Sequence, residues 1–175
     1  MRGRRTGNSL SSESVIRWPQ GHTPEESVLH AVNELQIEAD RERVFAWLRR
    51  PDLWPSYYRN SRFVRHLEGP WPEVELGSHF RWLTFGVIVS SEIVEFEPPE
   101  RIAWSAKELG ASGYHEWVLE QRDGGTFVRT EETQRGWGMR LAAPAMRRLM
   151  PRYHQKWLEG LARVAAEGPP PPPSG

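Results

Sequence analysis

The sequence feature that most restricts the fold is a series of short strand-like segments, separated by tight turns, that fills residues 61–136. The first four segments lie between turn signals such as FGV and EPPE, and they cover residues 61–68, 78–85, 87–96 and 101–106. A hairpin over residues 112–136 completes the series. Strands that follow one another through short connections pair antiparallel, so this part of the chain predicts an antiparallel sheet.

One more strand and two short helical segments precede this series. Residues 28–39 read as a strand, with Leu35 and Ile37 on one face. Asp40 is placed to cap a helix, and Pro51 ends it because proline cannot continue the backbone hydrogen bonding. The segment DLWPSYY that follows indicates a second short helix or a turn.

A long helix is predicted over residues 139–168, where apolar positions recur with helical period. Pro151 lies inside the pattern and predicts a kink or a split into two helices. Gly168, followed by proline, is a typical C-terminal stop. The apolar stripe comprises Met146, Leu149, Met150, Tyr153, Trp157, Leu161 and Val164.

Together these elements predict an α+β fold with a curved seven-stranded antiparallel sheet wrapped around the long C-terminal helix. Two short helices lie between the first and second strands. Since a helix and a curved sheet cannot touch everywhere, we expect an internal cavity between them. The organisation predicted is a disordered extension over residues 1–24, a single domain over 25–167, and a proline-rich disordered tail over 168–175.

Composition excludes several classes of function. Lys and Arg number 23 and Asp and Glu also number 23, which argues against a duplex nucleic-acid binder. The absence of cysteine excludes disulfides and thiolate metal sites. No apolar run is long enough for a transmembrane segment or a secretory signal, so we expect a cytoplasmic protein.

No motif predicts a cofactor or a metal. The six histidines lack metal-ligand spacing, and the sequence has no Walker loop, no G-x-G-x-x-G and no G-x-S-x-G. A homodimer remains open. The arginines of the last helix could bind an acidic partner or a membrane surface, but Glu159 and Glu167 in the same segment favour a solvated helix face.

The hairpin SGYHEWVLEQRDGGTFVRTEETQRG allows two registers. With the loop on Asp123 and Gly124, His115 lies opposite Glu132; with the loop one residue later, it lies opposite Gln134. In both registers one face holds His115, Trp117, Leu119, Val128, Thr130 and Glu132. That apolar-rich face is predicted to turn inward. The opposite face is predicted to be the wetter one, with Glu116, Val118, Glu120, Arg129 and Glu131.

An inward histidine beside an inward carboxylate has two interpretations. Cross-strand neighbours lie about 4.5–5.5 Å apart at Cβ, so His115 and Glu132 can hydrogen-bond. In the first interpretation the two side chains only satisfy each other's hydrogen-bonding groups, at the mouth of the sheet. In the second they belong to a functional site, as a polar anchor for a ligand or as a catalytic pair.

Aromatic residues are the second sign of a pocket, since the chain has nine tryptophans. Any one of them is explained by core packing, but together with adaptable methionines they favour a pocket wall. In the segment VIVSSEIVEF, both alternating sets of residues contain apolar side chains, so the alternation does not show which set faces inward. A bulge near Ile93 would allow apolar residues of both sets to face inward. Glu92 is assigned to the solvent side. The candidate ligand-binding residues are Trp54, Tyr57, Tyr58, Phe80, Trp82, Trp104, Trp117, Thr130, Met146, Met150, Tyr153 and Trp157.

Four segments of the sequence carry a family resemblance. Three of them are GSHFRWLTFGVIVSSEIVEFEPPERIAW, YHEWVLEQRDGGTFVRTEETQRG and HQKWLEGLARVAAE, and the fourth is EADRERVFAWLRRPDLWPSYY. In this order they resemble the START/polyketide-cyclase (SRPBCC) superfamily, above all its bacterial polyketide cyclase/dehydrase branch, over residues 28–167. The resemblance implies the helix-grip fold with a hydrophobic cavity under the long helix. His115, Trp117 and Glu132 match positions that this branch often carries.

Two functions follow as expectations. The first is a non-catalytic protein that binds a small hydrophobic or aromatic molecule between the sheet and the last helix. The alternative is an enzyme of the aromatase/cyclase or dehydratase type, a lyase or isomerase without a metal. In it His115 would be the general base and Glu132 would hold its tautomer.

Overall fold

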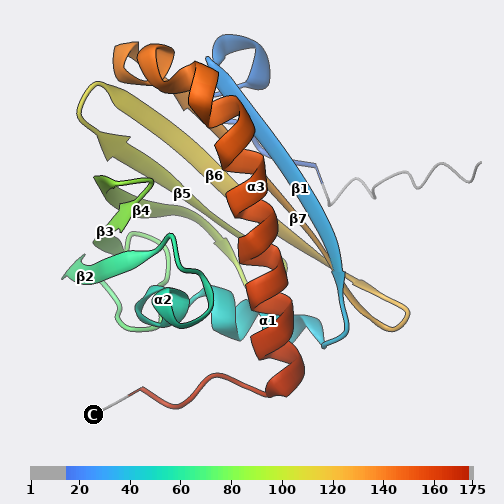
Figure 1. Ribbon diagram of the computed structural model, residues 1–175. Helices are drawn as coiled ribbons and strands as arrows, with labels where there is room; N and C mark the ends of the chain where they lie inside the picture. Colours follow the sequence, from blue (N-terminus) through green and yellow to red (C-terminus); the bar gives the residue numbers. More distant parts are fainter. Residues whose placement is uncertain (1–14, 174–175) are drawn as a thin grey trace, which may run out of the picture.

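The computed structural model describes residues 15–173 and shows one curved sheet crossed by a long helix (Figure 1). The seven strands are all antiparallel and lie in the order β1-β7-β6-β5-β4-β3-β2. They are β1 (Leu29–Ile37), β2 (Arg62–Glu68), β3 (His79–Thr84), β4 (Val87–Glu97), β5 (Arg101–Glu108), β6 (Ala111–Arg122) and β7 (Gly125–Arg135). The predicted α+β architecture is confirmed.

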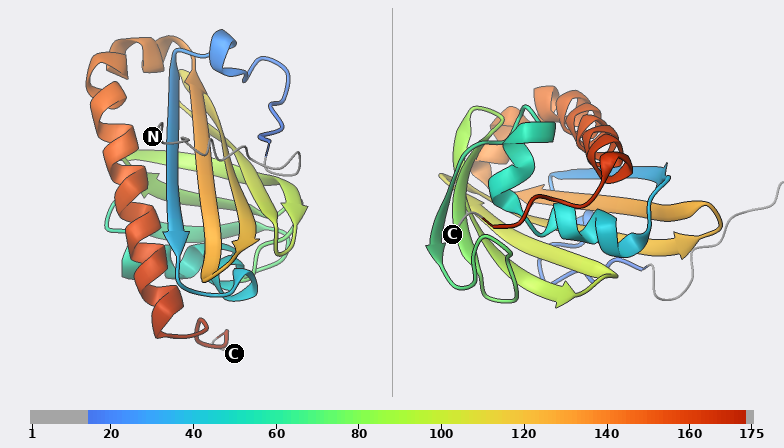
Figure 2. Two further views of the ribbon diagram at one scale, coloured as in Figure 1. Left: turned by 90° about the vertical axis from the view of Figure 1, so that its right-hand side faces the viewer. Right: turned by 90° about the horizontal axis from the view of Figure 1, so that it is seen from below.

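The sheet bends around the long helix α3 (Trp137–Glu167), and two short helices close one end of the space between them (Figure 2). These are α1 (Arg41–Leu48) and α2 (Trp54–Tyr57), with single 3-10 turns at η2 (Pro24–Glu26) and η3 (Pro51–Leu53). Helix α3 packs mainly along β1 and against α1. No helix among residues 15–173 is long and apolar enough to span a bilayer.

Helix α1 begins and ends where its sequence dictates. The Asp40 side chain accepts a hydrogen bond from the backbone N–H of Arg43, which caps the first turn. Val44, Phe45 and Leu48 then fall on one face and are buried. The carbonyl of Leu48 accepts a hydrogen bond from the indole of Trp54, so the end of α1 is tied to the start of α2.

Helix α3 is continuous in spite of Pro144 and Pro151, and its axis turns near the N-terminal end rather than breaking (Figure 2). The first turns lie across one end of the sheet, and the remainder runs down its concave face. Two registers were open for the β6–β7 hairpin. Arg122 pairs with Gly125 and His115 with Glu132, so the loop is on Asp123 and Gly124.

The β4 strand contains the bulge that its sequence predicted. The register against β5 shifts between Ile93 and Glu95. Val89 and Ile93 are buried on the inner face, whereas Glu92 is half-exposed and lies 3.3 Å from the ring of His79. The assignment of Glu92 to the solvent side is therefore confirmed.

The outer face of the hairpin is not the wet surface that the sequence predicted. Glu116 and Glu131 are almost fully buried. The Glu116 carboxylate pairs with the Arg101 guanidinium and accepts a hydrogen bond of 3.0 Å from the backbone N–H of Arg17. The prediction was wrong because a distant segment of the chain covers this face.

That covering segment belongs to the predicted N-terminal extension. Ile16 is buried in a small cluster with Ala103, Tyr114 and Val118, and residues 15–28 follow the convex face of the sheet (Figure 2). Residues 15–24 therefore pack on the domain, while residues 1–14 lie outside the described part of the chain.

The start of the proline-rich tail is also attached. The carbonyl of Gly168 accepts a hydrogen bond from the indole of Trp47 at 2.8 Å, and the carbonyl of Pro171 accepts one from Arg50 at 2.9 Å. Residues 168–173 thus return to α1 and η3, and residues 174–175 lie outside the described part of the chain.

Gly160 sets the distance between α2 and α3. A Cβ atom at this position would lie 2.2 Å from the carbonyl oxygen of Tyr57. Alanine normally favours a helix over glycine by about 1 kcal/mol, but here Gly160→Ala should destabilise the protein by about 2 kcal/mol because the helices must separate. Urea unfolding of this variant, with the exposed neighbour Glu159→Ala as control, measures the difference. Equal stability of the two variants would contradict the close packing.

Candidate functional site

A pocket of about 120 Å³ lies under the N-terminal half of α3, against the inner face of strands β3 to β7. Its wall is mostly aromatic and aliphatic, with Tyr58 stacked on Trp157 at a centroid distance of 4.4 Å. Glu108 and Glu132 are its acidic residues, and among the described residues no lysine or arginine lines it. The cavity that the sequence predicted is therefore small, apolar and acidic at one end.

The structure brings eight of the predicted site residues together in this wall. They are Tyr58, Trp82, Trp104, His115, Glu132, Met146, Met150 and Trp157. Their neighbours in the wall include Val87, Met139, Ala142 and His154, which the sequence analysis did not assign to the site.

Six other candidates lie elsewhere. Trp54, Phe80 and Trp117 are fully buried in the core beside the pocket. Thr130 lies behind His115, where its hydroxyl contacts the ring. Tyr57 and Tyr153 line a separate, more open depression next to Lys156. The alternation of a strand fixes which residues turn inward, but it does not tell a pocket wall from a solid core.

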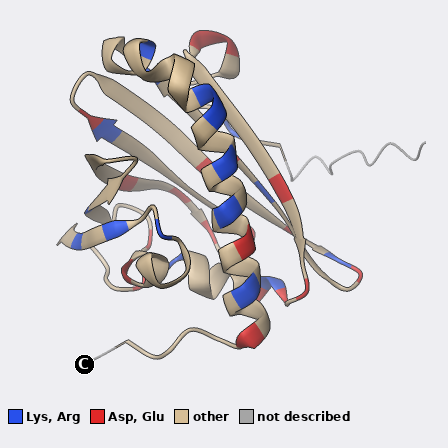
Figure 3. Cartoon of the chain, in the orientation of Figure 1, with Lys and Arg blue, Asp and Glu red and all other residues tan. Residues whose placement is uncertain are grey.

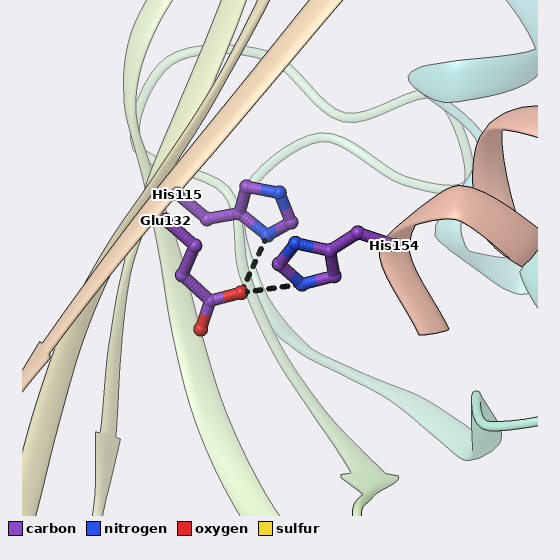
Figure 4. A group of neighbouring side chains, drawn as sticks. All are labelled: His115, Glu132 and His154. Atoms are coloured by element: carbon purple, nitrogen blue, oxygen red, sulfur yellow. Dashed lines mark ion pairs between the residues drawn. The ribbon is translucent and has the colours of Figure 1, made fainter. Parts of the chain in front are cut away.

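At the polar end of the pocket two histidines from different elements converge on one carboxylate oxygen of Glu132 (Figure 4). The Nδ1 atom of His115, on β6, lies 3.1 Å from Oε2 of Glu132, on β7. The Nε2 atom of His154, on α3, lies 3.0 Å from the same oxygen. The other carboxylate oxygen accepts a hydrogen bond from the amide of Gln134.

Burial and hydrogen bonding fix the charges of this cluster. Burial opposes ionisation of Glu132, but the electrostatic attraction of His115 and the hydrogen bonds from His154 and Gln134 outweigh it and lower the pKa of Glu132. Burial lowers the pKa of His115 to about 3, which outweighs the attraction of the neighbouring carboxylate. At neutral pH the cluster therefore contains an ionised Glu132 and a neutral His115.

These charges determine the tautomers. An ionised carboxylate can only accept hydrogen bonds, so Nδ1 of His115 and Nε2 of His154 both carry hydrogen. Nε2 of His115 then accepts a hydrogen bond from the hydroxyl of Thr130 at 2.6 Å. Nδ1 of His154 is buried and has no hydrogen-bond partner among residues 15–173. The ring nitrogen of the site without a hydrogen-bond partner among the described residues therefore belongs to His154, whereas Nε2 of His115 is occupied.

The sequence contained a signal for His154. It follows Met150 by four residues and precedes Trp157 by three, so it lies on the same helix face as both. The predicted stripe included Tyr153 instead, which is only partly buried. Because the helix period is not an integer, a stripe can be read one residue to either side.

His115, Glu132 and His154 are also the one group among the described residues whose donor atoms could hold a metal ion, since these atoms lie within 4.8 Å of one another. Spacing in the sequence could not show such a group, because each residue comes from a different element. A zinc ion with bonds of about 2.0–2.1 Å requires its ligand atoms within about 4.2 Å of one another. The two nitrogen–oxygen distances of 3.1 and 3.0 Å meet this limit and are also ordinary hydrogen-bond distances.

A second carboxyl group lies at the edge of the pocket. Glu108, at the end of β5, is half-buried, and burial together with the charge of Glu132 raises its pKa. The two carboxyl groups make the polar side of the pocket repel anions.

Comparison with known proteins assigns the chain to a family. Residues 29–166 match the family model described as "Polyketide cyclase / dehydrase and lipid transport", so the chain belongs to this family. No curated protein matches the sequence.

Solved structures share the fold. The hypothetical protein jhp0584 from Helicobacter pylori is 28% identical, with a TM-score of 0.81, over 90% of this chain and 99% of its own. The di-domain ARO/CYC StfQ from the steffimycin biosynthetic pathway is 15% identical, with a TM-score of 0.67, over 82% of this chain and 52% of its own. Ara h 8.0201 is 13% identical, with a TM-score of 0.63, over 80% of this chain and 99% of its own.

The neutral state of His115 predicts how stability depends on pH. Because the folded protein holds the pKa of His115 at about 3, below its ordinary 6.5, the unfolded chain takes up a proton first as the pH falls. Folded stability should therefore decrease below about pH 6.5, by up to about 1.4 kcal/mol per pH unit from this residue. The depressed pKa of Glu132 acts in the same direction at lower pH.

Urea unfolding at pH 7, 6 and 5 tests this dependence. The free energy of unfolding should fall more steeply for the wild type than for His115→Asn, which lacks the titrating ring. If both proteins give the same slope, His115 is not held neutral in the folded state.

Proposed function

We propose that this protein binds one small, uncharged and largely apolar molecule that carries a single hydrogen-bond donor, in the pocket under α3. The observation that supports this most directly is the lining of the pocket. Aromatic rings and methionines form most of the wall, and one acid–imidazole cluster forms its polar end. Sites for small organic ligands commonly combine an apolar wall with a few polar groups in this way.

The charges of the wall select against anions. The carboxylate of Glu132 is ionised, Glu108 lies at the pocket edge, and no lysine or arginine among the described residues lines the wall. A buried carboxylate or phosphate on the ligand would face this negative charge without a cation to compensate it. We therefore infer a neutral ligand and exclude free fatty acids.

His154 supplies the group that orients the ligand. Its buried Nδ1 atom has no hydrogen-bond partner among residues 15–173, and the ring lines the pocket. In the neutral ring this nitrogen is a hydrogen-bond acceptor. A hydroxyl or N–H group of the ligand would satisfy this acceptor, which otherwise remains a buried polar atom without a hydrogen bond. Met146 and Met150 can adapt to the shape of the remainder.

The volume indicates the size of the ligand. A cavity of about 120 Å³ is comparable to the engineered cavity of about 150 Å³ that binds benzene in another protein. A pocket of this volume suits a ligand with one ring or a short branched chain, and a larger polycyclic molecule would require α3 to move.

Calorimetric titration with matched ligands tests the proposal. We expect 4-ethylphenol, which is neutral and carries a hydroxyl donor, to bind at least ten times more tightly than 4-ethylbenzoate. Met150→Trp should fill the pocket and weaken binding of the phenol at least tenfold. Leu149→Trp is the matched control, since Leu149 precedes it on the helix and is partly exposed outside the pocket.

Two results would contradict the proposal. The first is binding of the benzoate as tight as that of the phenol, and the second is an equal effect of the two tryptophan substitutions. The experiment depends on the charge and shape of the pocket alone, so no natural ligand has to be known.

A second candidate function is a lyase or isomerase of the cyclase/dehydratase type, acting without a metal or cofactor. The observation in its favour is the carboxylate–imidazole pair, in which Glu132 accepts a hydrogen bond from one nitrogen of His154 and leaves the other nitrogen free. In this arrangement His154 rather than His115 is the general base, because Thr130 occupies the lone pair of His115.

Exchange of the methyl protons of acetophenone for deuterium in D₂O, followed by NMR, tests this candidate. The wild type should accelerate the exchange over buffer, and His154→Gln should lose a factor of about 10² or more. An exchange rate equal to that of buffer would leave binding as the function, and loss of exchange in Glu132→Gln with unchanged phenol binding would favour the enzyme.

A further inference from the structure

Large apolar side chains are exposed around the mouth of the pocket. Leu109 is 91% exposed and Leu141 is 76% exposed, which is far more than such residues show when they only cover a core. Isolated exposed apolar residues are common on soluble proteins, but a contiguous group marks an interaction surface. We call this group the apolar rim, and it comprises Val87, Ile88, Leu109, Trp137 and Leu141.

Contacts between the three segments make the rim one surface. The backbone N–H of Gly138 donates a hydrogen bond of 2.9 Å to the carbonyl of Gly110, which joins the start of α3 to the β5–β6 turn. The ring of Trp137 lies directly against Gly110. Val87 from β4 lines the same pocket as Met139 from α3, so the β3–β4 turn meets the others at the pocket mouth.

Cationic side chains accompany the rim. From Trp137 to Leu158 helix α3 contains no acidic residue, and its first acidic residue is Glu159. Figure 3 shows bands of lysine and arginine along α3 before its first acidic band. No ion pair joins these arginines to a carboxylate within residues 15–173. The four exposed arginines are Arg140, Arg147, Arg148 and Arg152.

This concentration of charge is a local feature, since the whole chain has a formal net charge of zero. The sequence favoured a solvated helix face because Glu159 and Glu167 follow in the same segment. The structure separates them, because the two acidic residues lie on the C-terminal turns, beyond the part of the helix that borders the pocket mouth.

We propose that the apolar rim and the four arginines dock this protein on the surface of an anionic lipid membrane, with the pocket mouth facing the bilayer. Exposed large apolar side chains on three neighbouring segments, among them Trp137 and two leucines, suit shallow insertion among lipid headgroups. The arginines match the phosphates of anionic lipids. The proposal does not depend on what the pocket binds, since it concerns the surface alone.

The two parts of the surface act together. A few exposed apolar side chains give weak adsorption to any bilayer, and a cluster of arginines gives weak, salt-sensitive attraction to an anionic one. Membrane binding should therefore be reversible, and it should require both negative lipids and the rim.

Cosedimentation with sucrose-loaded vesicles measures the binding. The full-length protein should bind vesicles of phosphatidylcholine with 30% phosphatidylglycerol at least ten times more tightly than vesicles of phosphatidylcholine alone. Raising the salt from 0.1 to 0.5 M should remove most of this difference. In vesicles with brominated acyl chains, part of the tryptophan emission should be quenched in the wild type but not in Trp137→Phe.

Four variants of exposed residues separate the two contributions. Trp137→Ser with Leu141→Ser should weaken binding to the anionic vesicles at least tenfold, and so should Arg147→Glu with Arg148→Glu. Leu76→Ser is the matched apolar control, since Leu76 is 64% exposed at the opposite end of β3. Arg163→Glu is the matched charge control on the last turns of α3. Neither control should change binding, and all four should retain the melting temperature of the wild type within a few degrees.

Several results would overturn the proposal. They are absence of sedimentation with either kind of vesicle, equal binding to both kinds, or equal effects of the rim and control variants. A dimer that forms in solution without vesicle binding, and that Trp137→Ser with Leu141→Ser abolishes, would instead assign the rim to a contact between two copies of the chain.

Discussion

One buried anion connects the two layers of this protein. The Glu132 carboxylate is enclosed between the sheet and α3, and an ionised group in such a place is tolerated only where hydrogen-bond donors surround it. Two donors come from the sheet, from His115 and Gln134, and one crosses from the helix, from His154. The helix therefore cannot pack more closely against the strands without breaking the hydrogen bonds to this carboxylate. The pocket is the space that remains beside the cluster.

The tryptophans near the Glu132 cluster form two sets, one in the solid core and one in the pocket wall. Trp54 and Trp117 are enclosed on all sides and fill the core, where their rings pack against Trp157 at 4.9 and 5.1 Å. Trp82, Trp104 and Trp157 have one side toward the pocket. Tryptophan therefore both fills the core behind the pocket wall and forms part of that wall. This explains why composition alone favoured a core, and why only the tryptophans taken together with the methionines indicated a pocket.

The sequence predicted the parts of the fold that depend on local chemistry. Asp40 and Pro51 gave the limits of α1, and the alternation in the hairpin gave its inner face with His115 and Glu132. It could not choose between loops on Asp123–Gly124 and Gly124–Gly125, because both turns are favourable locally and only the packing of the whole strand separates them. It missed the burial of Glu116, which depends on a contact with Arg17, far away in the sequence. It missed His154 because the apolar stripe of the helix was assigned through Tyr153, one residue away.

The two prolines of α3 give the helix an uneven stiffness. Pro144 and Pro151 lack the N–H that would bond to the turn before them, so the backbone is weakest in the half that covers the pocket. The other half is fixed where Gly160 touches α2 and where the chain after Gly168 returns to Trp47. Because the hydrogen bond from Gly138 to Gly110 ties the start of α3 to the sheet as well, any bending of the helix is confined to the span between its two fixed ends, which is the span that covers the pocket.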